Sequence, residues 1–328
     1  MSVQALVLNH YNGPLEPTTL AKPNPGPGQV LVRIAASGLN PLDTKIRAGA
    51  AAHARHPLPL VLGIDMAGTV EAVGAGVTAF RPGDEVYGMT GGVAGMQGSL
   101  AQYAAVDADL LARKPSNLSM REAAALPLAF ITAYAGIVDR AHLRAGQTVL
   151  VQGGAGGVGH IAVQLASALG ATVFATASER NLGLVSELGA KPIDYRAESV
   201  EAYVAAYTQG EGFDLVVDTV GGPTLDASFA AVKHFGHVVS ALGWGTHALA
   251  PLSFREATYS GVFTLYPLLT GKLRAHHGEM MREATRLVES GLLRPVVDPR
   301  RFTMAQAEQA YELVAAGTAR TKVVVEIE

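Results

Sequence analysis

The segment Thr148-Val149-Leu150-Val151-Gln152-Gly153-Gly154-Ala155-Gly156-Gly157-Val158-Gly159 decides the fold of this chain. A short run of apolar residues predicts a strand, and residues 158–169 carry apolar side chains at helical spacing. Between them the glycines follow the pattern G-x-G-x-x-G, which permits a tight turn, a close approach to a pyrophosphate and close packing of helix on strand. Backbone N–H groups at the start of a helix hold phosphates. We therefore expect a dinucleotide to bind at Gly154, Ala155, Gly156, Gly157, Val158 and Gly159.

The end of the next predicted strand bears on the choice between NAD and NADP. An acidic side chain there would bind the ribose hydroxyls and repel a 2′-phosphate. Counting about 20 residues from the glycines reaches Thr176, which is neutral. Ser178 and Arg180 follow, and both can bind a phosphate, so we expect NADPH as the cofactor. If Glu179 and not Arg180 faces the ribose, the preference reverses, and Arg180 is then an ordinary solvated charge at a helix start.

Strands and helices alternate on both sides of the glycine segment. The predicted strands lie at residues 148–152, 172–177, 191–194, 213–218, 237–242 and 262–265, a pattern typical of a doubly wound parallel sheet. The first hundred residues instead carry short β-rich runs between Gly and Pro, which favours a small barrel. The fold class is therefore α/β. We expect a β-barrel domain at residues 1–122, to which residues 267–328 return, and a dinucleotide-binding domain at residues 123–266.

Composition narrows the range of functions. With 328 residues, 49% of them hydrophobic, two domains are expected. The net charge of −3, with charges scattered singly, predicts neither a nucleic acid nor a membrane surface as partner. The absence of cysteine excludes disulfides, thiolate nucleophiles and cysteine-held zinc. The first ten residues do not resemble a secretory signal, so a cytoplasmic location is expected.

Several motifs follow one another along the chain: Gly38-Leu39-Asn40-Pro41-Leu42-Asp43, Gly63-Ile64-Asp65-Met66-Ala67-Gly68, Val73-Gly74-Ala75-Gly76-Val77, Gly83-Asp84-Glu85-Val86, the glycine segment and Val217-Asp218-Thr219-Val220-Gly221-Gly222. In this order they resemble the motifs of the medium-chain dehydrogenase/reductase superfamily, and more closely those of its zinc-free quinone oxidoreductase branch, which includes the zeta-crystallins. The resemblance covers essentially the whole chain. It implies a GroES-like barrel domain beside a Rossmann domain, with substrate in the cleft between them.

The sequence departs from the zinc-dependent members of this superfamily at the ligand positions. Asn40 stands about where the first cysteine ligand would be, Ile64-Asp65 replaces a His-Glu pair, and Leu128 falls near the third ligand. Catalytic zinc needs three protein ligands, so no metal site and no metal-assisted alcohol oxidation are expected. The pairs His53/His56 and His276/His277 lack a carboxylate that would complete a site.

The resemblance also implies further cofactor contacts. Tyr195 follows the third strand of the predicted sheet, where an aromatic side chain can lie against the adenosine, although it can equally be a packing tyrosine. The other implied contacts are Thr132, Thr219, Val220, Leu242, Gly243, Thr264 and Lys322.

Hydride transfer to a conjugated carbon needs few obligatory side chains, because the protein mainly orients the reactants and stabilises a developing enolate or phenolate. By resemblance Asn40 and Asp43 face the nicotinamide. We expect Asn40 to donate a hydrogen bond to the substrate oxygen or the cofactor amide, Asp43 to orient it, and Lys45 or Arg47 to favour the anionic product. Lys45 stands where many relatives have tyrosine, so the proton donor is left open. Asn and Asp beside Pro41 are also ordinary turn residues.

The expected function is therefore a zinc-independent, NADPH-dependent reduction of quinones or α,β-unsaturated carbonyl compounds. The alternatives are an enone or enoyl-thioester reductase with a wider cleft, and a non-catalytic NADPH-binding protein that acts as a crystallin or a sensor. A short-chain reductase is not expected, because no tyrosine is followed by lysine in the pattern Tyr-x-x-x-Lys. Family habit implies a homodimer through the sheet edge near Phe263. The loops at residues 50–60 and 244–259 are expected to set specificity, and the sequence does not name the substrate.

Overall fold

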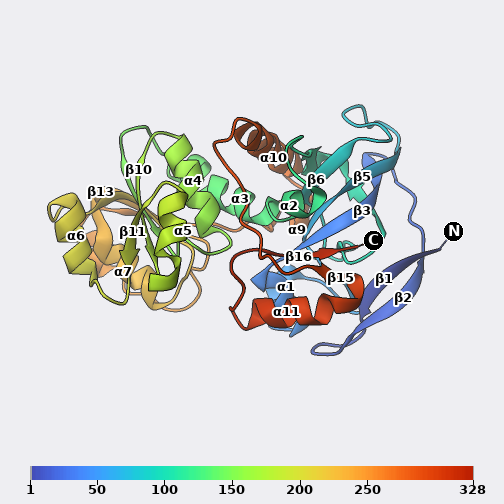
Figure 1. Cartoon of the computed structure of the whole chain (residues 1–328), viewed down its shortest axis with the longest axis horizontal. Helices are drawn as coiled ribbons and strands as arrows, with labels where there is room; N and C mark the ends of the chain where they lie inside the picture. The colour runs from blue at the N-terminus through green and yellow to red at the C-terminus, as the bar shows by residue number, and fades with distance from the viewer. Residues whose placement is uncertain (1, 328) are drawn as a thin grey trace. The chain divides into compact units, whose positions relative to one another are not determined.

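The computed structural model describes residues 2–327, which form two compact units (Figure 1). The first unit runs up to Leu128 and includes Leu265–Gly291 and the chain from Pro295 onward, and the second comprises Ala129–Thr264 with Leu292–Arg294. The predicted division differs at residues 123–128, 265–266 and 292–294. The last of these belong to the second unit because the Gln164 side chain donates to the Arg294 carbonyl at 3.0 Å and accepts from the Arg294 N–H at 2.9 Å.

The second unit is built on a six-stranded sheet whose neighbouring strands are all parallel. Its order is β11-β10-β9-β12-β13-β14, so the chain winds outward from β9 in one direction and then from β12 in the other. This is the doubly wound fold expected from the sequence, and ligands bind at the point where the winding reverses. The strands are β9 (Thr148–Gln152), β10 (Thr172–Ala177), β11 (Lys191–Asp194), β12 (Phe213–Asp218), β13 (Val232–Ser240) and β14 (Thr258–Gly261).

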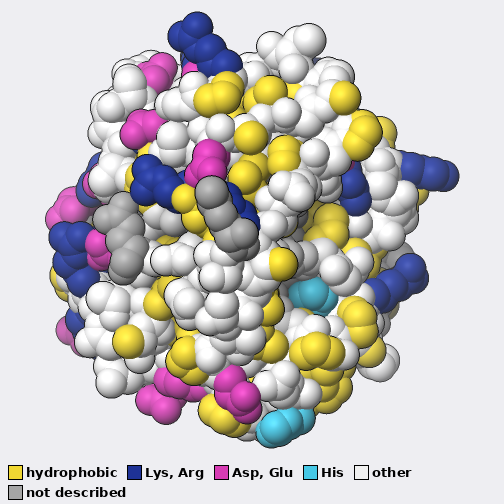
Figure 2. All heavy atoms as spheres, turned by 90° about the vertical axis from the view of Figure 1, so that its right-hand side faces the viewer, with side chains coloured by type: hydrophobic (Ala, Val, Ile, Leu, Met, Phe, Trp, Pro, Cys, Tyr) yellow, Lys and Arg dark blue, Asp and Glu magenta, His cyan; other side chains and the backbone are white. Residues whose placement is uncertain are grey.

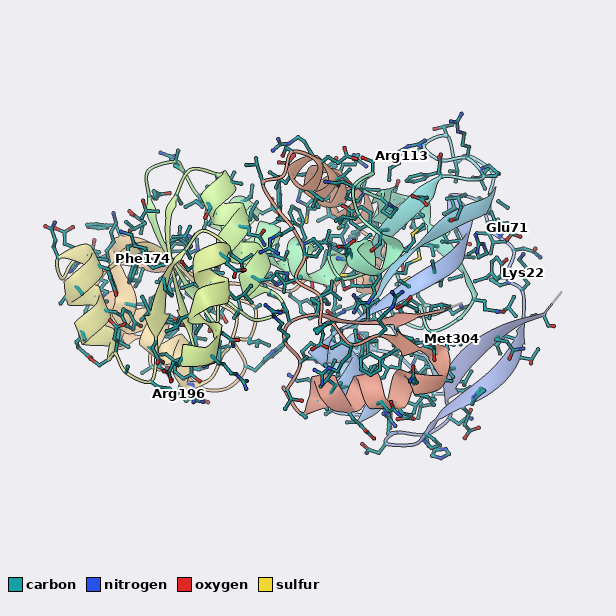
Figure 3. All side chains as sticks on the ribbon, viewed as in Figure 1. Lys22, Glu71, Arg113, Phe174, Arg196 and Met304 are labelled. Carbon is teal, nitrogen blue, oxygen red and sulfur yellow. The ribbon has the colours of Figure 1, made fainter. Side chains whose placement is uncertain are left out.

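Helices connect these strands, and aromatic side chains fill the core on one side of the sheet. Phe174 of β10, labelled in Figure 3, lies with its ring centroid 5.3 Å from that of Phe213. The helices are α4 (Gly159–Ala168), α5 (Leu182–Glu187), α6 (Val200–Thr208), α7 (Pro223–Ala231) and α8 (Ala250–Ser253), with η4 (Glu179–Asn181) before α5. The helix α3 (Pro127–Tyr134) leads in from the first unit and continues as the π-helical η3 (Ala135–Arg140).

The sixth strand was predicted wrongly at residues 262–265. The structure places β14 at Thr258–Gly261, paired with β13 from His237 to Ser240. The residues of β14 are polar or glycine except for Tyr259, and all are exposed or half-buried. An edge strand of this kind lacks the apolar run by which buried strands are recognised, and the apolar residues after it were taken for the strand instead.

The first unit contains two sheets and carries the C-terminal strand. The larger sheet has the order β15-β16-β3-β5-β6-β8 with β7 on β3, and the smaller one β2-β1-β4. The strand β16 pairs antiparallel with β3, so the last residues return to the first unit as expected (Figure 1). The strands are β1 (Ser2–Leu8), β2 (Leu15–Ala21), β3 (Gln29–Leu39), β4 (Leu60–Val61), β5 (Asp65–Val73), β6 (Glu85–Met89), β7 (Tyr103–Asp107), β8 (Leu111–Arg113), β15 (Phe302–Thr303) and β16 (Val323–Glu326).

Helices cover the sheets of the first unit. The longest, α10 (Arg274–Glu289), buries Met280, Met281, Ala284, Leu287 and Val288, the face expected from the sequence. The Tyr87 hydroxyl on β6 donates to the Met281 carbonyl at 2.8 Å and fixes the helix on the sheet. The other helical segments are α1 (Pro41–Arg47), η1 (Ala52–Ala54), η2 (Ala108–Leu110), α2 (Met120–Ala124), α9 (Tyr266–Thr270), η5 (Met304–Gln306) and α11 (Ala307–Ala315).

Charged side chains on the surface are interspersed. The face in Figure 2 shows basic, acidic and apolar side chains mixed together. Lys22 is paired with Glu71, and Arg113 with Asp84 at 2.8 Å (Figure 3). Within residues 2–327, no helix combines the length and the apolar character needed to cross a bilayer.

Two helical glycines of the second unit give opposite expectations for stability. A Cβ added to Gly159 would lie 2.1 Å from the Gly153 carbonyl oxygen, whereas one added to Gly183 in α5 would have no atom within 4 Å. We expect Gly159→Ala to lower the free energy of unfolding by about 2 kcal/mol or more. Gly183→Ala should raise it by about 0.5–1 kcal/mol, because alanine is the better helix former. Urea denaturation followed by circular dichroism measures both, and equal effects would contradict this account of the helix–strand contact.

Candidate functional site

The turn after β9 is held by the end of β10. Gly153 has a φ of 74°, so the left-handed turn residue is the one before the first glycine of the motif. Its N–H donates to the Thr176 hydroxyl at 3.0 Å, and the Gly154 N–H donates to the Thr176 carbonyl at 2.9 Å. A Cβ on Gly154 would lie 2.5 Å from that of Ala175. Glycine at both positions therefore lets the turn pack directly on the neighbouring strand.

Three backbone N–H groups at this turn have no acceptor within the described part of the chain. They belong to Ala155, Gly157 and Val158, just before α4 begins at Gly159. The Gly156 N–H donates to the Gly153 carbonyl at 2.9 Å and closes the turn. N–H groups at the positive end of a helix dipole form an anion site, so the turn has the donors for a pyrophosphate.

The end of β12 lies against this turn. The Thr219 hydroxyl donates to the Gln152 carbonyl at 2.7 Å, and a Cβ on Gly153 would lie 2.8 Å from the Val220 Cγ2. Val220 is 49% exposed and is thus available to a ligand. Thr219 and Val220 therefore lie beside the glycine turn, at the reversal point between β9 and β12.

The buried carboxylate of Asp218 accepts hydrogen bonds from the loop after β12 and from the end of β13. Its Oδ1 accepts from the N–H groups of Val220 and Gly221 at 3.1 and 3.0 Å. Its Oδ2 accepts from the Ser240 hydroxyl at 2.6 Å, and that hydroxyl oxygen accepts from the Leu242 N–H at 3.1 Å. These hydrogen bonds hold Leu242, a predicted cofactor contact, near Val220.

The residues expected to select NADPH lie at the ends of β10 and β11. The Thr176 hydroxyl donates to the Gln152 side chain at 2.8 Å and is buried, so it is committed to the fold. Ser178 accepts from Asn181 at 3.2 Å, while Glu179 and Arg180 are exposed and form no ion pair with the described residues. Tyr195 is 53% exposed, with the Arg196 guanidinium 5.6 Å from its ring centroid.

The remaining predicted cofactor residues are more scattered. Thr132 is buried in α3, and Thr264 is half-buried beyond the end of β14. Gly243 is exposed, and a Cβ there would lie 2.0 Å from the Tyr259 hydroxyl. Lys322 belongs to the first unit, where it is buried in a different cluster. The cofactor roles of these four residues stay predictions.

The first unit contains a buried polar cluster around Asp65. Asp65, Asn40 and Lys322 are 0, 2 and 4% exposed. The Asn40 amide donates to Asp65 Oδ2 at 3.0 Å, and the Lys322 ammonium donates to the Asn40 side-chain oxygen and to the Leu39 carbonyl. The ammonium also lies 3.6 Å from Asp65 Oδ2. Burial raises the pKa of Asp65 and lowers that of Lys322, and the attraction between them opposes both shifts.

Asp43 lies at the edge of this cluster. Its Oδ2 accepts from the Asn40 N–H at 2.8 Å, and its Oδ1 is buried with no partner among the described residues. Burial raises the pKa of Asp43 to about 7. The hydroxyl of buried Tyr311 is likewise unpartnered among these residues, and burial, with the charge of Asp43, holds its pKa well above the usual range.

The contacts of the expected catalytic residues differ from those that the sequence suggested. Asn40 and Asp43 are brought together, but the Asn40 amide nitrogen donates to Asp65 at 3.0 Å and to the Gly38 carbonyl at 3.4 Å. Its oxygen accepts from Lys322, so in this conformation only the long bond to Gly38 could be exchanged for one to a substrate. Lys45 is exposed on α1, two residues from buried Asp43, and joins neither. Sequence reasoning noted Asp65 only as the replacement of a zinc ligand. A carboxylate inside an apolar run was the available signal, because a buried charge needs a partner.

The donor set does not fit a zinc ion. Within residues 2–327 no three His, Asp or Glu side chains converge as metal ligands would. At the expected ligand positions stand Asn40, Ile64 and Leu128. The neighbouring Asp65 already accepts from the Leu128 N–H at 2.9 Å and from Asn40, and it forms an ion pair with Lys322 at 3.6 Å. A lysine ammonium thus provides the positive charge beside this carboxylate.

Comparison with known proteins gives the family. Residues 26–116 match the alcohol dehydrogenase GroES-like domain and residues 188–325 the family described as zinc-binding dehydrogenase. The chain is 38% identical to the NADPH-dependent alkenal/one oxidoreductase of Arabidopsis thaliana chloroplasts, over 90% of this chain and 72% of the relative. It is 32% identical to the chloroplast envelope quinone oxidoreductase homolog of the same plant, over 99% and 98%.

A solved structure agrees over the full length. The alcohol dehydrogenase superfamily protein from Novosphingobium aromaticivorans is 59% identical and superposes with a TM-score of 0.98, over 99% of this chain and all of that one. The doubly wound sheet, the glycine turn and the β-rich first unit are shared features of that fold. The chain therefore belongs to the medium-chain dehydrogenase/reductase superfamily, in its quinone oxidoreductase branch.

Proposed function

We propose that this protein is a zinc-independent, NADPH-dependent reductase that transfers hydride to quinones or α,β-unsaturated carbonyl compounds. The observation that carries the proposal is a glycine turn in which the N–H groups of Ala155, Gly157 and Val158 have no acceptor among the described residues. The expected metal-ligand positions of the same chain hold Asn40, Ile64 and Leu128. Relatives named as an alkenal/one oxidoreductase and a quinone oxidoreductase homolog support the substrate class.

The residues of the second unit would hold the cofactor. Bound NADPH would supply the hydride. The N–H groups of Ala155, Gly157 and Val158 would bind the pyrophosphate, and Thr219 and Val220 would contact the cofactor where the winding of the sheet reverses. Exposed Tyr195 follows the strand next to β10, so it lies at the edge where the adenosine would bind.

A homodimer and a cytoplasmic location remain parts of this proposal. The strand β14 is the last of the second unit's sheet, and its backbone is free on one side. An exposed edge strand favours pairing with a second copy, which supports dimerisation through this edge.

The central test is NADPH oxidation by purified protein, treated with a chelator, in the presence of quinones and enones. We expect turnover that survives chelation and prefers NADPH, since no step requires a metal. Oxidation of simple alcohols with NADP⁺ serves as the control and should not occur. Chelator-sensitive alcohol oxidation would overturn the proposal, and NADPH binding without turnover of any acceptor would favour a sensor or structural role.

Cofactor preference is expected to depend on Arg180. Arg180→Ala should weaken NADPH binding by about 1–3 kcal/mol through loss of a charge-assisted phosphate contact, and should leave NADH binding nearly unchanged. Arg144→Ala is the matched control, because Arg144 is exposed and lies before β9, at the opposite end of the strand from the glycine turn. Fluorescence titration with both cofactors measures the effect. Equal weakening for both would show that Arg180 does not bind the 2′-phosphate.

The buried Asp43 carboxyl should make stability depend on pH. The unfolded chain releases this proton near pH 4, whereas the folded chain keeps it up to about pH 7. Rising pH therefore favours the unfolded state between these values, by about 1.4 kcal/mol per pH unit, and the loss levels off above them. Asp43→Asn keeps an acceptor for the Asn40 N–H and removes the ionisation. The wild type should lose stability relative to this variant between pH 5 and 7, as measured by urea denaturation, and parallel pH profiles would disprove the assignment.

A further inference from the structure

The loop after β13 exposes the only tryptophan of the chain. Trp244 is 55% exposed, which is costly for so large an apolar side chain. The loop begins after Ser240, the last residue of β13, and passes through Leu242, a predicted cofactor contact. The indole therefore lies beyond the carboxyl end of a strand, at the edge where doubly wound sheets bind their ligands.

Three loops at this edge are in direct contact, and they connect the glycine turn with the loop of Trp244. A Cβ on Gly153 would lie 2.8 Å from the Val220 Cγ2, and one on Gly221 would lie 2.6 Å from the Leu242 carbonyl oxygen. Glycine at both positions lets the loops after β9, β12 and β13 pack directly on one another. Val220 is exposed and Leu242 half-buried, so together with Trp244 they form an accessible apolar surface.

The loop of Trp244 is held against α7 and β14. The His247 Nδ1 lies 2.9 Å from a carboxylate oxygen of Asp226 on α7, and the His247 Nε2 lies 3.4 Å from the Trp244 carbonyl. The hydrogen bond to Asp226 raises the pKa of His247, which favours the charged ring that donates from both nitrogens. A Cβ on Gly243 would lie 2.0 Å from the Tyr259 hydroxyl, so the loop also packs on β14. The indole is thus carried by a backbone that is fixed on two sides.

The nicotinamide end of the cofactor is the part that this apolar surface would face. In a doubly wound sheet a dinucleotide lies across the reversal point, with its two halves on opposite sides. Arg180 and Tyr195 follow β10 and β11, where the proposed function has the adenosine. The nicotinamide would then lie on the other side, at Val220 and Leu242, and the hydride acceptor must lie against its ring. Trp244 stands at this end of the surface.

We infer that Trp244 selects hydride acceptors that carry a planar aromatic or quinonoid ring, against which its indole stacks. The inference rests on the proposed function for the position of the nicotinamide. Offset stacking of two rings contributes beyond the apolar area that it buries. A saturated ring of the same size covers the same area but has no π-face. Planarity is therefore the property of the acceptor that Trp244 distinguishes.

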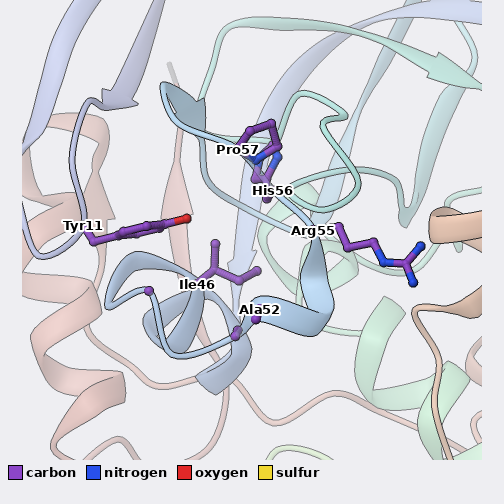
Figure 4. A pocket seen from close by; sticks show the side chains of 8 residues that line it. Tyr11, Ile46, Ala52, Arg55, His56 and Pro57 are labelled. Carbon is purple, nitrogen blue, oxygen red and sulfur yellow. The ribbon is translucent and has the colours of Figure 1, made fainter.

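The first unit offers another place for an apolar ring. It contains a pocket of about 390 Å³, lined by Tyr11, Ile46 and Ala52 among others (Figure 4). Figure 4 shows the Arg55 side chain extending away from this pocket. None of the proposed cofactor contacts lines it. A ring bound there would not depend on Trp244, so the two places can be distinguished by substitution.

Calorimetry on the full chain saturated with NADP⁺ tests the inference with 4-phenylbutan-2-one and 4-cyclohexylbutan-2-one, ketones that differ only in the saturation of the ring. We expect Trp244→Ala to weaken binding of the phenyl ketone about threefold to tenfold more than binding of the cyclohexyl ketone. Trp244→Phe keeps an aromatic face and should retain part of the selectivity. Phe254→Ala is the matched control and should change neither, because Phe254 is 78% exposed but precedes β14, at the opposite edge of the sheet.

Fluorescence of the wild type gives an independent readout, because all tryptophan emission comes from Trp244. The phenyl ketone should change this emission with the dissociation constant found by calorimetry. Emission that responds to protein concentration and to neither ketone would show that a second copy of the chain covers Trp244, and would overturn the inference. Equal weakening of both ketones by Trp244→Ala overturns it too. So does ring binding that survives Trp244→Ala and is lost in Ala52→Phe, which fills the pocket of the first unit.

Turnover of the corresponding enones with NADPH separates the inference from the proposed function. A KM raised by Trp244→Ala for 4-phenylbut-3-en-2-one, and not for its cyclohexyl counterpart, supports both. Reduction of both enones with KM values that Trp244→Ala changes equally contradicts the inference alone. Absence of turnover, with the ring-selective loss of ketone binding still present, contradicts the reductase function and leaves Trp244 as the contact of a bound planar ring.

Discussion

The carboxylate of Asp65 is the interaction on which the first unit depends. It accepts from the Leu128 N–H and the Asn40 amide and forms an ion pair with the Lys322 ammonium. These groups come from the start of α3, the end of β3 and the start of β16, segments that are far apart in the sequence. Each charge in the cluster is buried and would be costly alone, so the segments are stable only together. Asn40 is the residue before α1 and its N–H donates to Asp43, so the cluster also positions α1 and Asp43.

The second unit depends on a comparable arrangement made from neutral groups. Thr176 bonds to Gln152 and to the amides of Gly153 and Gly154, so the end of β10 defines the turn after β9. This leaves the next N–H groups free to face an anion. The Thr176 hydroxyl is engaged in this turn, so the proposed preference for NADPH rests on residues after β10, such as Arg180, and not on Thr176.

Local sequence patterns predicted most strands and helices of the second unit, but they did not predict the polar cluster around Asp65 in the first unit. The glycine motif and the buried face of α10 follow from spacing and periodicity within short windows, whereas the return of β16 to the first unit, though expected, has no such local pattern. The strand β14 was missed because an exposed edge strand carries no apolar signal. Asn40 is bonded to Asp65, 25 positions away, and to Lys322, 282 positions away, and nothing local to Asn40 distinguishes a free amide from a bonded one. Lys45 was chosen for its position in a motif, and the turn of α1 directs it to solvent.

Because β16 pairs with β3, the two units can be completed at different times during synthesis. Residues 129–264 of the second unit are continuous, and its sheet has all its strands once Gly261 has left the ribosome. The first unit is begun earlier but lacks Lys322 and β16 until residues 322–326 emerge. Until then the Asp65 carboxylate lacks its Lys322 partner, and β3 is open at residues 36–39, where β16 will pair, although β7 already pairs with residues 29–33. The part of the chain that is made first is thus completed last, and in that interval its open edge is exposed to other nascent chains and to chaperones.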